Sequence, residues 1–229
     1  MEFLSSLFEP IVEIFRVLMG AFYSVTEVTG FPNYGVAIIL MTVCVRGCLY
    51  PLSKKQIMSM KAMQEIQPKL KEIQNRYKKD PTMMQQKMGE LYQESGVNPL
   101  AGCLPLLVQM PILMGVYYAL YGFEYQGDPG FLWLTSLSEV DATYILPLLS
   151  ALTTYLVQKQ TTMTSGQENQ QMEMMMYIMP IFIGYISINF PSGLVLYWVS
   201  MNICQMVQQW YMFRNQDDAV SEKAKKGDA

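Results

Sequence analysis

The arginine at position 46 is the residue of this sequence whose surroundings most strongly suggest a chemical role. It lies inside the apolar run 35–52, which contains no other charged residue. If the run is a helix, a rise of about 1.5 Å per residue places Arg46 about 16 Å from its start, close to the middle of a bilayer. A guanidinium there costs roughly 2.5 to more than 10 kcal/mol, so such residues face a bundle interior or a wet cavity. We therefore interpret Arg46 as a functional positive charge.

The apolar runs contain no acidic residue that could neutralise this charge. This absence favours water or a transient ligand as the partner of Arg46. Polar side chains inside the predicted spans could line a groove around it, and Thr42 shares its helix face one turn earlier. The other polar residues in the spans are Gln109, Gln158, Tyr197, Ser200, Asn202 and Gln205. Taken singly, several of them are equally explained by hydrogen bonds between helices.

Much other chemistry is excluded by composition. The sequence has no histidine, so a histidine-dependent nucleophile triad is impossible. The four cysteines, at positions 44, 48, 103 and 204, lie in apolar runs without a CxxC spacing, and small buried residues are the better interpretation. There is no glycine-rich phosphate loop and no pair of carboxylates inside a span. We therefore predict no metal site, no cofactor and no enzymatic activity.

The distribution of apolar residues predicts an all-α membrane protein. Hydrophobic residues make up 51% of the chain and charged residues only 15%, and the charges are grouped between long apolar runs. We expect five transmembrane helices, at residues 33–53, 99–121, 142–159, 173–190 and 191–213. The connecting segments are a polar region at 54–98, a loop at 122–141, a loop at 160–172 and a tail at 214–229, which we expect to be disordered.

The signs of the charges predict the orientation of the chain. Residues 54–98 hold nine Lys or Arg against five acids, whereas the loop at 122–141 holds four acids and no base. Basic segments next to spans stay on the cytoplasmic side. The polar region 54–98, the loop 160–172 and the C-terminus are therefore predicted to be cytoplasmic, and the N-terminus and the loop 122–141 lie outside.

The segment 1–32 predicts an amphipathic helix that lies in the outer membrane interface. Glu9, Glu13, Arg16 and Glu27 are spaced so that they fall on one helical stripe, and the rest of the segment is mostly apolar. It has no basic N-terminal region and no small-residue cleavage site, so we do not interpret it as an intact signal sequence.

The polar region 54–98 predicts a helical hairpin. Met63, Ile66 and Leu70 recur at spacings of three and four, and Asp80-Pro81 then gives a stop and a new helix start. Pro68 is expected to bend the first helix. Eight of its bases form the predicted cytoplasmic arm: Lys54, Lys55, Lys61, Lys69, Lys71, Arg76, Lys78 and Lys79. The arm is either a solvated hairpin that only satisfies the charge rule or a mobile element that binds anionic lipid, ribosomal RNA or a nascent apolar segment.

Several motifs of the chain resemble one known family, the YidC/Oxa/Alb membrane protein insertases. They are the stretch Thr42–Leu52, the stretch Arg76–Pro81, GVNPLAGCLPLLVQMPI at 96–112 and FPSGLVLYW at 190–198. They occur in the order and spacing of the family, and the resemblance covers residues 33–212. It is closest to the short form of Gram-positive bacteria, because the large periplasmic domain of Gram-negative members is absent.

The resemblance implies a bacterial plasma-membrane protein with a hydrophilic groove open to the cytoplasm and to lipid. The groove would be lined by Arg46, Thr42, Gln158, Trp198 and Asn202, with Tyr197 and Gln109 as further contacts. Arg46 would attract the acidic or polar outer segment of a substrate with one or two spans, and burial of the spanning helix would drive its release. The expected partners are nascent membrane proteins, the lipid bilayer, the ribosome and the Sec translocon, and DNA is not among them.

A small-anion transporter and an intramembrane protease are the two alternatives to an insertase. A small-anion transporter or channel could use Arg46 as its anion ligand, but the sequence has no paired repeat of interrupted helices and no coupling carboxylate. An intramembrane protease would need catalytic residues that the spans lack.

Overall fold

The computed structural model describes residues 2–98, 104–121, 123, 125–165 and 170–227. Its described residues fold into helices, apart from loops and one isolated bridge between Phe131 and Leu134. In chain order the helices are α1 (Glu2–Val28), α2 (Tyr34–Cys48), α3 (Tyr50–Arg76), α4 (Pro81–Ser95), α5 (Leu104–Leu120), α6 (Ile145–Ser165), α7 (Gln170–Ser187) and α8 (Ser192–Gly227). The predicted all-α fold class is confirmed.

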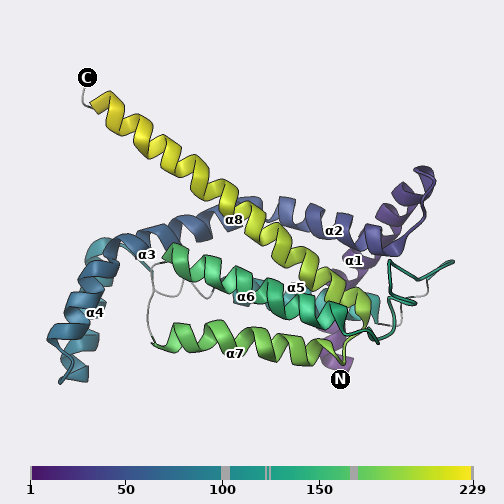
Figure 1. Ribbon diagram of the computed structural model, residues 1–229, viewed down its shortest axis with the longest axis horizontal. Helices are drawn as coiled ribbons and strands as arrows, with labels where there is room; N and C mark the ends of the chain where they lie inside the picture. The colour runs from purple at the N-terminus through teal and green to yellow at the C-terminus, as the bar shows by residue number, and fades with distance from the viewer. Residues whose placement is uncertain (1, 99–103, 122, 124, 166–169, 228–229) are drawn as a thin grey trace.

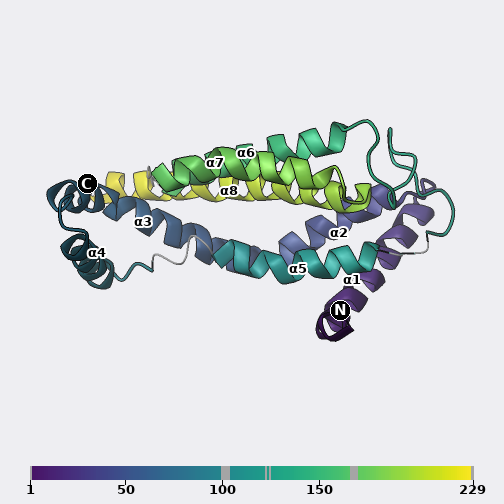
Figure 2. The same cartoon turned by 90° about the horizontal axis from the view of Figure 1, so that it is seen from below.

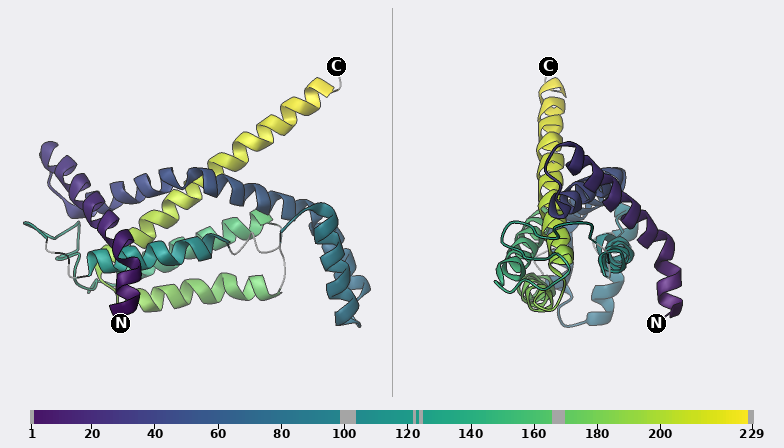
Figure 3. Two further views of the ribbon diagram at one scale, coloured as in Figure 1. Left: turned by 180° about the vertical axis from the view of Figure 1, so that it is seen from behind. Right: turned by 90° about the vertical axis from the view of Figure 1, so that its right-hand side faces the viewer.

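The helices form an elongated bundle with an appendage at each end (Figure 1). Helix α6 packs on α7 and α8, α2 packs on α8, and α1 packs on α2 and α5. Figure 2 shows α6, α7 and α8 in one layer and α2 and α5 in the other. Helix α1 crosses the bundle obliquely at one end, and the pair α3 and α4 projects from the opposite end (Figure 3).

The core of the bundle joins α1, α2, α5, α6, α8 and the loop between α5 and α6. Apolar residues of these elements are buried together: Val12, Phe15, Met19, Ile38, Met41, Val116, Leu137, Leu146, Leu194 and Tyr197. Gly115 on α5 permits the close approach of α1, because a Cβ there would lie 2.5 Å from Ile11 Cγ2. Glu9, Glu13, Arg16 and Glu27 on α1 are all exposed.

The run that contains Arg46 is not one continuous helix, which corrects the expected helix at 33–53. Helix α2 ends at Cys48, Leu49 separates it from α3, and the two axes differ by 63°. Pro51 lies in the first turn of α3, where it has no N–H to donate to the preceding turn. Arg46 therefore lies in the last turn of α2, beside a bend, and not in the middle of a straight span.

A test by length and apolar composition finds no described helix that could cross a membrane by itself. Only the bent pair α2 and α3 passes the test jointly, and shorter apolar stretches occur at Val108–Leu120 and Met174–Ser187. The count of five transmembrane helices and the predicted orientation therefore stay predictions.

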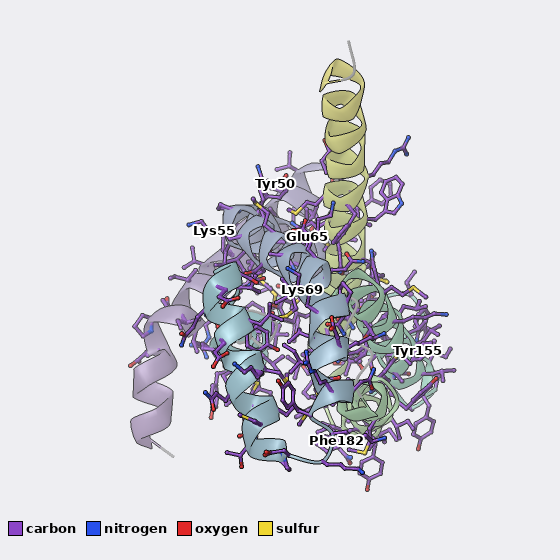
Figure 4. The ribbon with its side chains drawn as sticks, turned by 90° about the vertical axis from the view of Figure 1, so that its left-hand side faces the viewer. Tyr50, Lys55, Glu65, Lys69, Tyr155 and Phe182 are labelled. Atoms are coloured by element: carbon purple, nitrogen blue, oxygen red, sulfur yellow. The ribbon has the colours of Figure 1, made fainter. Side chains whose placement is uncertain are left out.

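The arm consists of α3 and α4, which pack together. Met63, Ile66, Leu70, Leu91 and Val97 form a small buried core between them. Asp80 accepts a hydrogen bond from the Met83 N–H at 3.1 Å and so caps α4, and Gly96 ends this helix in the left-handed conformation. Helix α3 is continuous through Pro68 and curves away from the bundle (Figure 3). In Figure 4, which looks onto this end, Lys55 and Lys69 lie along α3 beside α4.

Two further segments bear on the predicted elements. The backbone of α8 continues as a helix to Gly227, so the expected disordered tail at 214–229 is wrong for residues 214–227. The loop between α5 and α6 is tied to the start of α8, because the N–H of Ser192 donates to Glu139 O at 2.7 Å and that of Gly193 to Leu137 O at 2.9 Å. The loop thus closes the end of the bundle that carries α1.

Candidate functional site

The guanidinium of Arg46 contacts α8. Its Nη2 donates to Oε1 of Gln205 at 2.7 Å and to the carbonyl of Met201 at 3.4 Å. Its Nε is buried and has no hydrogen-bond partner. The sequence predicted water or a transient ligand as the partner of this charge, whereas the structure supplies a neutral amide from α8. The charge is therefore held by dipoles and not by an acid.

Gln208, one turn further along α8, ties the same two helices together. Its Nε2 donates to the backbone carbonyl of Arg46 at 3.1 Å, and its Oε1 is buried without a partner. Because Arg46 lies in the last turn of α2, its carbonyl has no acceptor role within its own helix. Gln208 thus donates to a backbone carbonyl at the end of α2, while Gln205 accepts from the guanidinium of Arg46.

Three of the predicted groove residues line a small cavity beside Arg46. Thr42, Gln109 and Tyr197 surround it together with Val45, Leu49, Ile112 and Met201. The cavity has a volume of about 10 Å³, which is the least that holds one water molecule. Thr42 is fully buried and its hydroxyl donates to Ile38 O at 2.7 Å, within its own helix. In this conformation the polar layer around Arg46 is nearly closed, and the groove open to the cytoplasm and to lipid stays a prediction.

The structure separates the other predicted groove residues from Arg46. Asn202 Nδ2 donates to Thr153 Oγ1 at 3.1 Å and to Thr154 Oγ1 at 3.0 Å, both on α6. Trp198 Nε1 donates to the same Thr154 Oγ1 at 3.0 Å. Gln158 is half-buried one turn beyond Thr154 on α6. These residues form a second polar cluster, between α6 and α8.

Helical geometry explains why one stretch of α8 serves two clusters. Successive residues differ by about 100° around an α-helix, so neighbours in sequence face different partners. Positions 197, 201, 205 and 208 follow a spacing of four, four and three and face α2 and α5, whereas 198 and 202 face α6. This spacing shows from the sequence that Gln205 and Gln208 share a helix face with Tyr197, but it does not show that this face meets Arg46. Thr153 and Thr154 carried no such signal.

An apolar cleft lies between α5, α7 and α8. It has a volume of about 270 Å³, and its lining includes Leu113, Tyr117, Ile183, Ile186, Val195 and Trp198. Trp198 therefore has its ring at the cleft and its N–H in the polar cluster with α6. The cleft is large enough for bulky apolar side chains, and nothing charged lines it. The apolar cleft thus borders α8, the helix that accepts the hydrogen bonds of the Arg46 guanidinium.

The predicted arm residues lie apart from these clusters. Seven of the eight are exposed along α3 or in the turn that follows it, and Lys61 is half-buried with its Nζ 5.2 Å from the centre of the Phe213 ring of α8. The arm base is thereby joined to the bundle. Across the described ranges, no group of three or more Cys, Asp or Glu is placed to hold a metal ion.

Comparison with known proteins gives the family. A family model described as 60Kd inner membrane protein matches residues 24–219, which is most of the chain. The chain belongs to this family. The motifs around Arg46 indicated membership in the YidC/Oxa insertases. The family model and the relatives described next confirm it.

Relatives cover the chain almost from end to end. The membrane protein insertase YidC of Clostridium perfringens is 42% identical over 221 residues, which are 91% of this chain and 92% of that protein. YidC of Oceanobacillus iheyensis is 48% identical over 196 residues, and MisCA of Bacillus subtilis is 42% identical over 197 residues. The match to the Oceanobacillus protein covers 80% of this chain and 77% of that protein. The match to MisCA covers 84% of this chain and 74% of that protein.

A solved structure agrees with the fold of this YidC/Oxa chain. The crystal structure of an active YidC insertase, with its first transmembrane domain resolved, superposes with a TM-score of 0.68 at 30% identity. The match covers 90% of this chain and 46% of that one, so the chain spans about half the length of the solved protein.

Proposed function

We propose that this chain is a membrane protein insertase of the bacterial plasma membrane, with its N-terminus outside and its C-terminus in the cytoplasm. The names of the relatives from Clostridium and Oceanobacillus support this function. The observation that carries its mechanism is the placement of Arg46, a half-buried cation whose side-chain contacts are neutral and whose Nε has no partner. A charge kept in that state is available to an anionic ligand.

The polar layer around Arg46 and the apolar cleft have different roles in insertion. Arg46 attracts the acidic or polar outer segment of a substrate with one or two spans, and Thr42, Gln109 and Tyr197 surround that contact. The cleft between α5, α7 and α8 receives the apolar segment that follows. Partition of that segment into lipid then releases the substrate, driven by burial of its apolar surface without a nucleotide.

The groove opens to the cytoplasm and to lipid only when a substrate enters. In the described conformation the cavity beside Arg46 has room for one water. The tie from Gln208 to the carbonyl of Arg46 holds α2 against α8, whereas the contacts of α5 with α8 are few and local. Movement of α5 is therefore the route by which the layer opens. Asn202, Trp198 and Gln158 form the adjoining wall on the α6 side.

The arm is the element that meets partners on the cytoplasmic side. Its exposed bases suit anionic lipid headgroups and ribosomal RNA, and a route through the Sec translocon is part of the same proposal. Its small core, joined to the bundle mainly through α3, allows it to move as a unit. We assign no catalytic reaction to the chain.

Reconstitution in liposomes tests the proposal. A one-span substrate is prepared with an acidic and with a neutral outer segment, and its insertion by purified protein is followed by protease protection. Arg46→Lys is expected to insert both substrates at nearly the wild-type level, because charge and not fork geometry is the variable. Arg46→Ala is expected to lose about tenfold for the acidic substrate and little for the neutral one.

Arg16→Ala is the matched control, because Arg16 is an exposed cation on α1. It should leave both insertion rates unchanged. Normal insertion of the acidic substrate by Arg46→Ala would refute the electrostatic mechanism. Uptake of labelled chloride or phosphate by the same liposomes, abolished by Arg46→Ala, would instead support the anion transporter.

A further inference from the structure

The side chain of Gln205 occupies one half of a site that fits a carboxylate. Nε and Nη2 of an arginine lie on the same edge of the guanidinium and together donate two parallel hydrogen bonds to a carboxylate. In this chain Nη2 of Arg46 donates to Oε1 of Gln205 at 2.7 Å, while Nε on the same edge is buried without a partner. In this geometry the amide oxygen of Gln205 accepts from Nη2 alone and leaves Nε without an acceptor.

The bond to Gln205 is strong enough to position Arg46 and weak enough to exchange. The bond from Arg46 to Gln205 already has an ionised donor, and a carboxylate in place of the amide adds the attraction between opposite charges, which is stronger inside a protein than in water. A substrate carboxylate that reaches this edge accepts hydrogen bonds from both Nε and Nη2 and is also attracted by the positive charge. The bond that breaks in exchange, from Nη2 to Gln205, has a neutral acceptor. The second acceptor of Nη2, the Met201 carbonyl, is already at 3.4 Å and would be lost at little cost.

Exchange does not require the two helices to separate. Gln208 Nε2 holds the backbone carbonyl of Arg46 at 3.1 Å, independently of the guanidinium. The α2 and α8 pair therefore keeps its contact while the side chain of residue 205 turns away. The small cavity beside Arg46 lies in the same polar layer, and the incoming carboxylate enters there first.

We propose that Gln205 is a placeholder for the substrate carboxylate and that residue 205 determines how strongly insertion depends on substrate acidity. The inference rests on the proposed function and extends it to a specificity-determining residue. Without a substrate, Gln205 keeps Arg46 from collapsing onto other acceptors. An acidic outer segment displaces it, and a neutral one does not.

Substitutions at position 205 give opposite expected results. Gln205→Glu places a carboxylate on Arg46 permanently, so the ratio of acidic to neutral insertion should fall about tenfold, to the level of Arg46→Ala. Gln205→Met removes the competing acceptor and keeps the size of the side chain, so the ratio should equal or exceed that of the wild type. Gln160→Glu is the matched control. Gln160 on α6 donates to Met206 O at 3.2 Å, so this change adds a carboxylate beside the residue that follows Gln205, on a side chain that does not bond to Arg46.

Thermal unfolding in detergent tests the contact without any substrate. Gln205→Glu should raise the melting temperature when Arg46 is present and lower it in an Arg46→Gln background, because the carboxylate then lacks a counter-charge. The same sign in both backgrounds, or a lower melting temperature with Arg46 present, would overturn the inference whatever the insertion data.

The insertion results separate this inference from the proposed function. If Arg46→Ala loses the preference for acidic segments while Gln205→Glu keeps the wild-type ratio, the placeholder role is wrong and the insertase mechanism stands. If Arg46→Ala itself keeps the ratio, the electrostatic mechanism fails and the inference fails with it. A loss of the preference in Gln160→Glu equal to that in Gln205→Glu would also refute it.

Discussion

The arm and the polar layer around Arg46 carry charge of the same sign in opposite surroundings. Along the arm, seven of the eight predicted bases are exposed, and water and salt screen each of them. Arg46 is half-buried between helices and is bonded to two carbonyl oxygens. One cation in that setting influences a passing anion more than several exposed ones, because its field is not screened. The surroundings of a charge, and not the number of charges, distinguish the two regions.

The apolar cores of the two regions differ in the same way. The bundle core draws side chains from helices and a loop spread over much of the sequence, and Leu137 of that loop is completely buried. The arm core has five buried residues, four from the neighbouring helices α3 and α4 and one, Val97, just after α4. A small local core opens at lower free energy than a large one with distant contacts. The arm should therefore move as a unit on a bundle that remains folded.

The largest expected effect comes from truncation of the bundle core. Leu137→Ala should lower the free energy of unfolding by about 2–5 kcal/mol, because it removes a fully buried side chain between the loop, α2 and α8. Leu70→Ala, the matched change in the arm, should reduce amide-exchange protection in α3 and α4 alone. Hydrogen exchange with mass spectrometry, together with melting in detergent, measures both. Equal loss of protection throughout the chain after Leu70→Ala would show that the arm is not a separate unit.

The second largest expected effect concerns two aspartates that accept hydrogen bonds at the starts of helices. Asp141 accepts hydrogen bonds from the N–H and hydroxyl of Thr143 and from the N–H of Leu146 at 2.7 Å, ahead of α6. Its replacement by Ala should cost about 1–3 kcal/mol. Asp80→Ala in the exposed arm should cost about 1 kcal/mol. Melting curves of the two variants test the order, and a greater loss for Asp80→Ala would contradict it.

Asp141 also predicts how the stability of the bundle depends on pH. Burial acts to raise the pKa of Asp141, but the hydrogen bonds from Thr143 and from the Leu146 N–H outweigh it and hold this pKa below its usual range. A lowered pKa in the folded state stabilises the fold above about pH 4, the value for an unfolded chain, and that contribution disappears as the pH falls through the folded value. The stability difference between the wild type and Asp141→Asn should therefore shrink in acid. A difference that stays constant from pH 7 to pH 3 would refute this.

The smallest expected effect concerns a single exposed base. Lys69→Gln should weaken any attraction of the arm to anionic lipid by about 1 kcal/mol or less, and the effect should vanish in high salt. Arg46→Ala should impair insertion of acidic segments at low and high salt alike. Insertion rates in liposomes with and without anionic lipid, at two salt concentrations, compare the two. Salt dependence of the Arg46 effect equal to that of Lys69 would remove the distinction between the regions.

The sequence allowed more of the fold to be predicted than of the site. Helix starts and ends depend on local chemistry, and the helix start at Asp80-Pro81 and the charged stripe of α1 occur where their spacing indicated. The break at Leu49 was missed, although Pro51 could have suggested it. At the site, Thr42 and Tyr197 do lie with Arg46, but Trp198 and Asn202 bond to threonines of α6. That assignment depends on the rotation of α8, which its polar residues alone did not give.

The amino-acid sequence by itself determined the family, the helical class and the presence of one cation in an apolar run. These follow from residue types, periods and motifs that are local in the chain. Only the tertiary structure decided which oxygen atoms meet that cation. Gln205 and Met201 lie more than 150 residues from Arg46, and their contact depends on how α2 and α8 are packed and rotated against each other. Neighbouring residues of α8 differ by about 100° around the helix axis, so a partner of Arg46 can be followed directly by a partner of α6, and the packing of the helices decides which residue faces which.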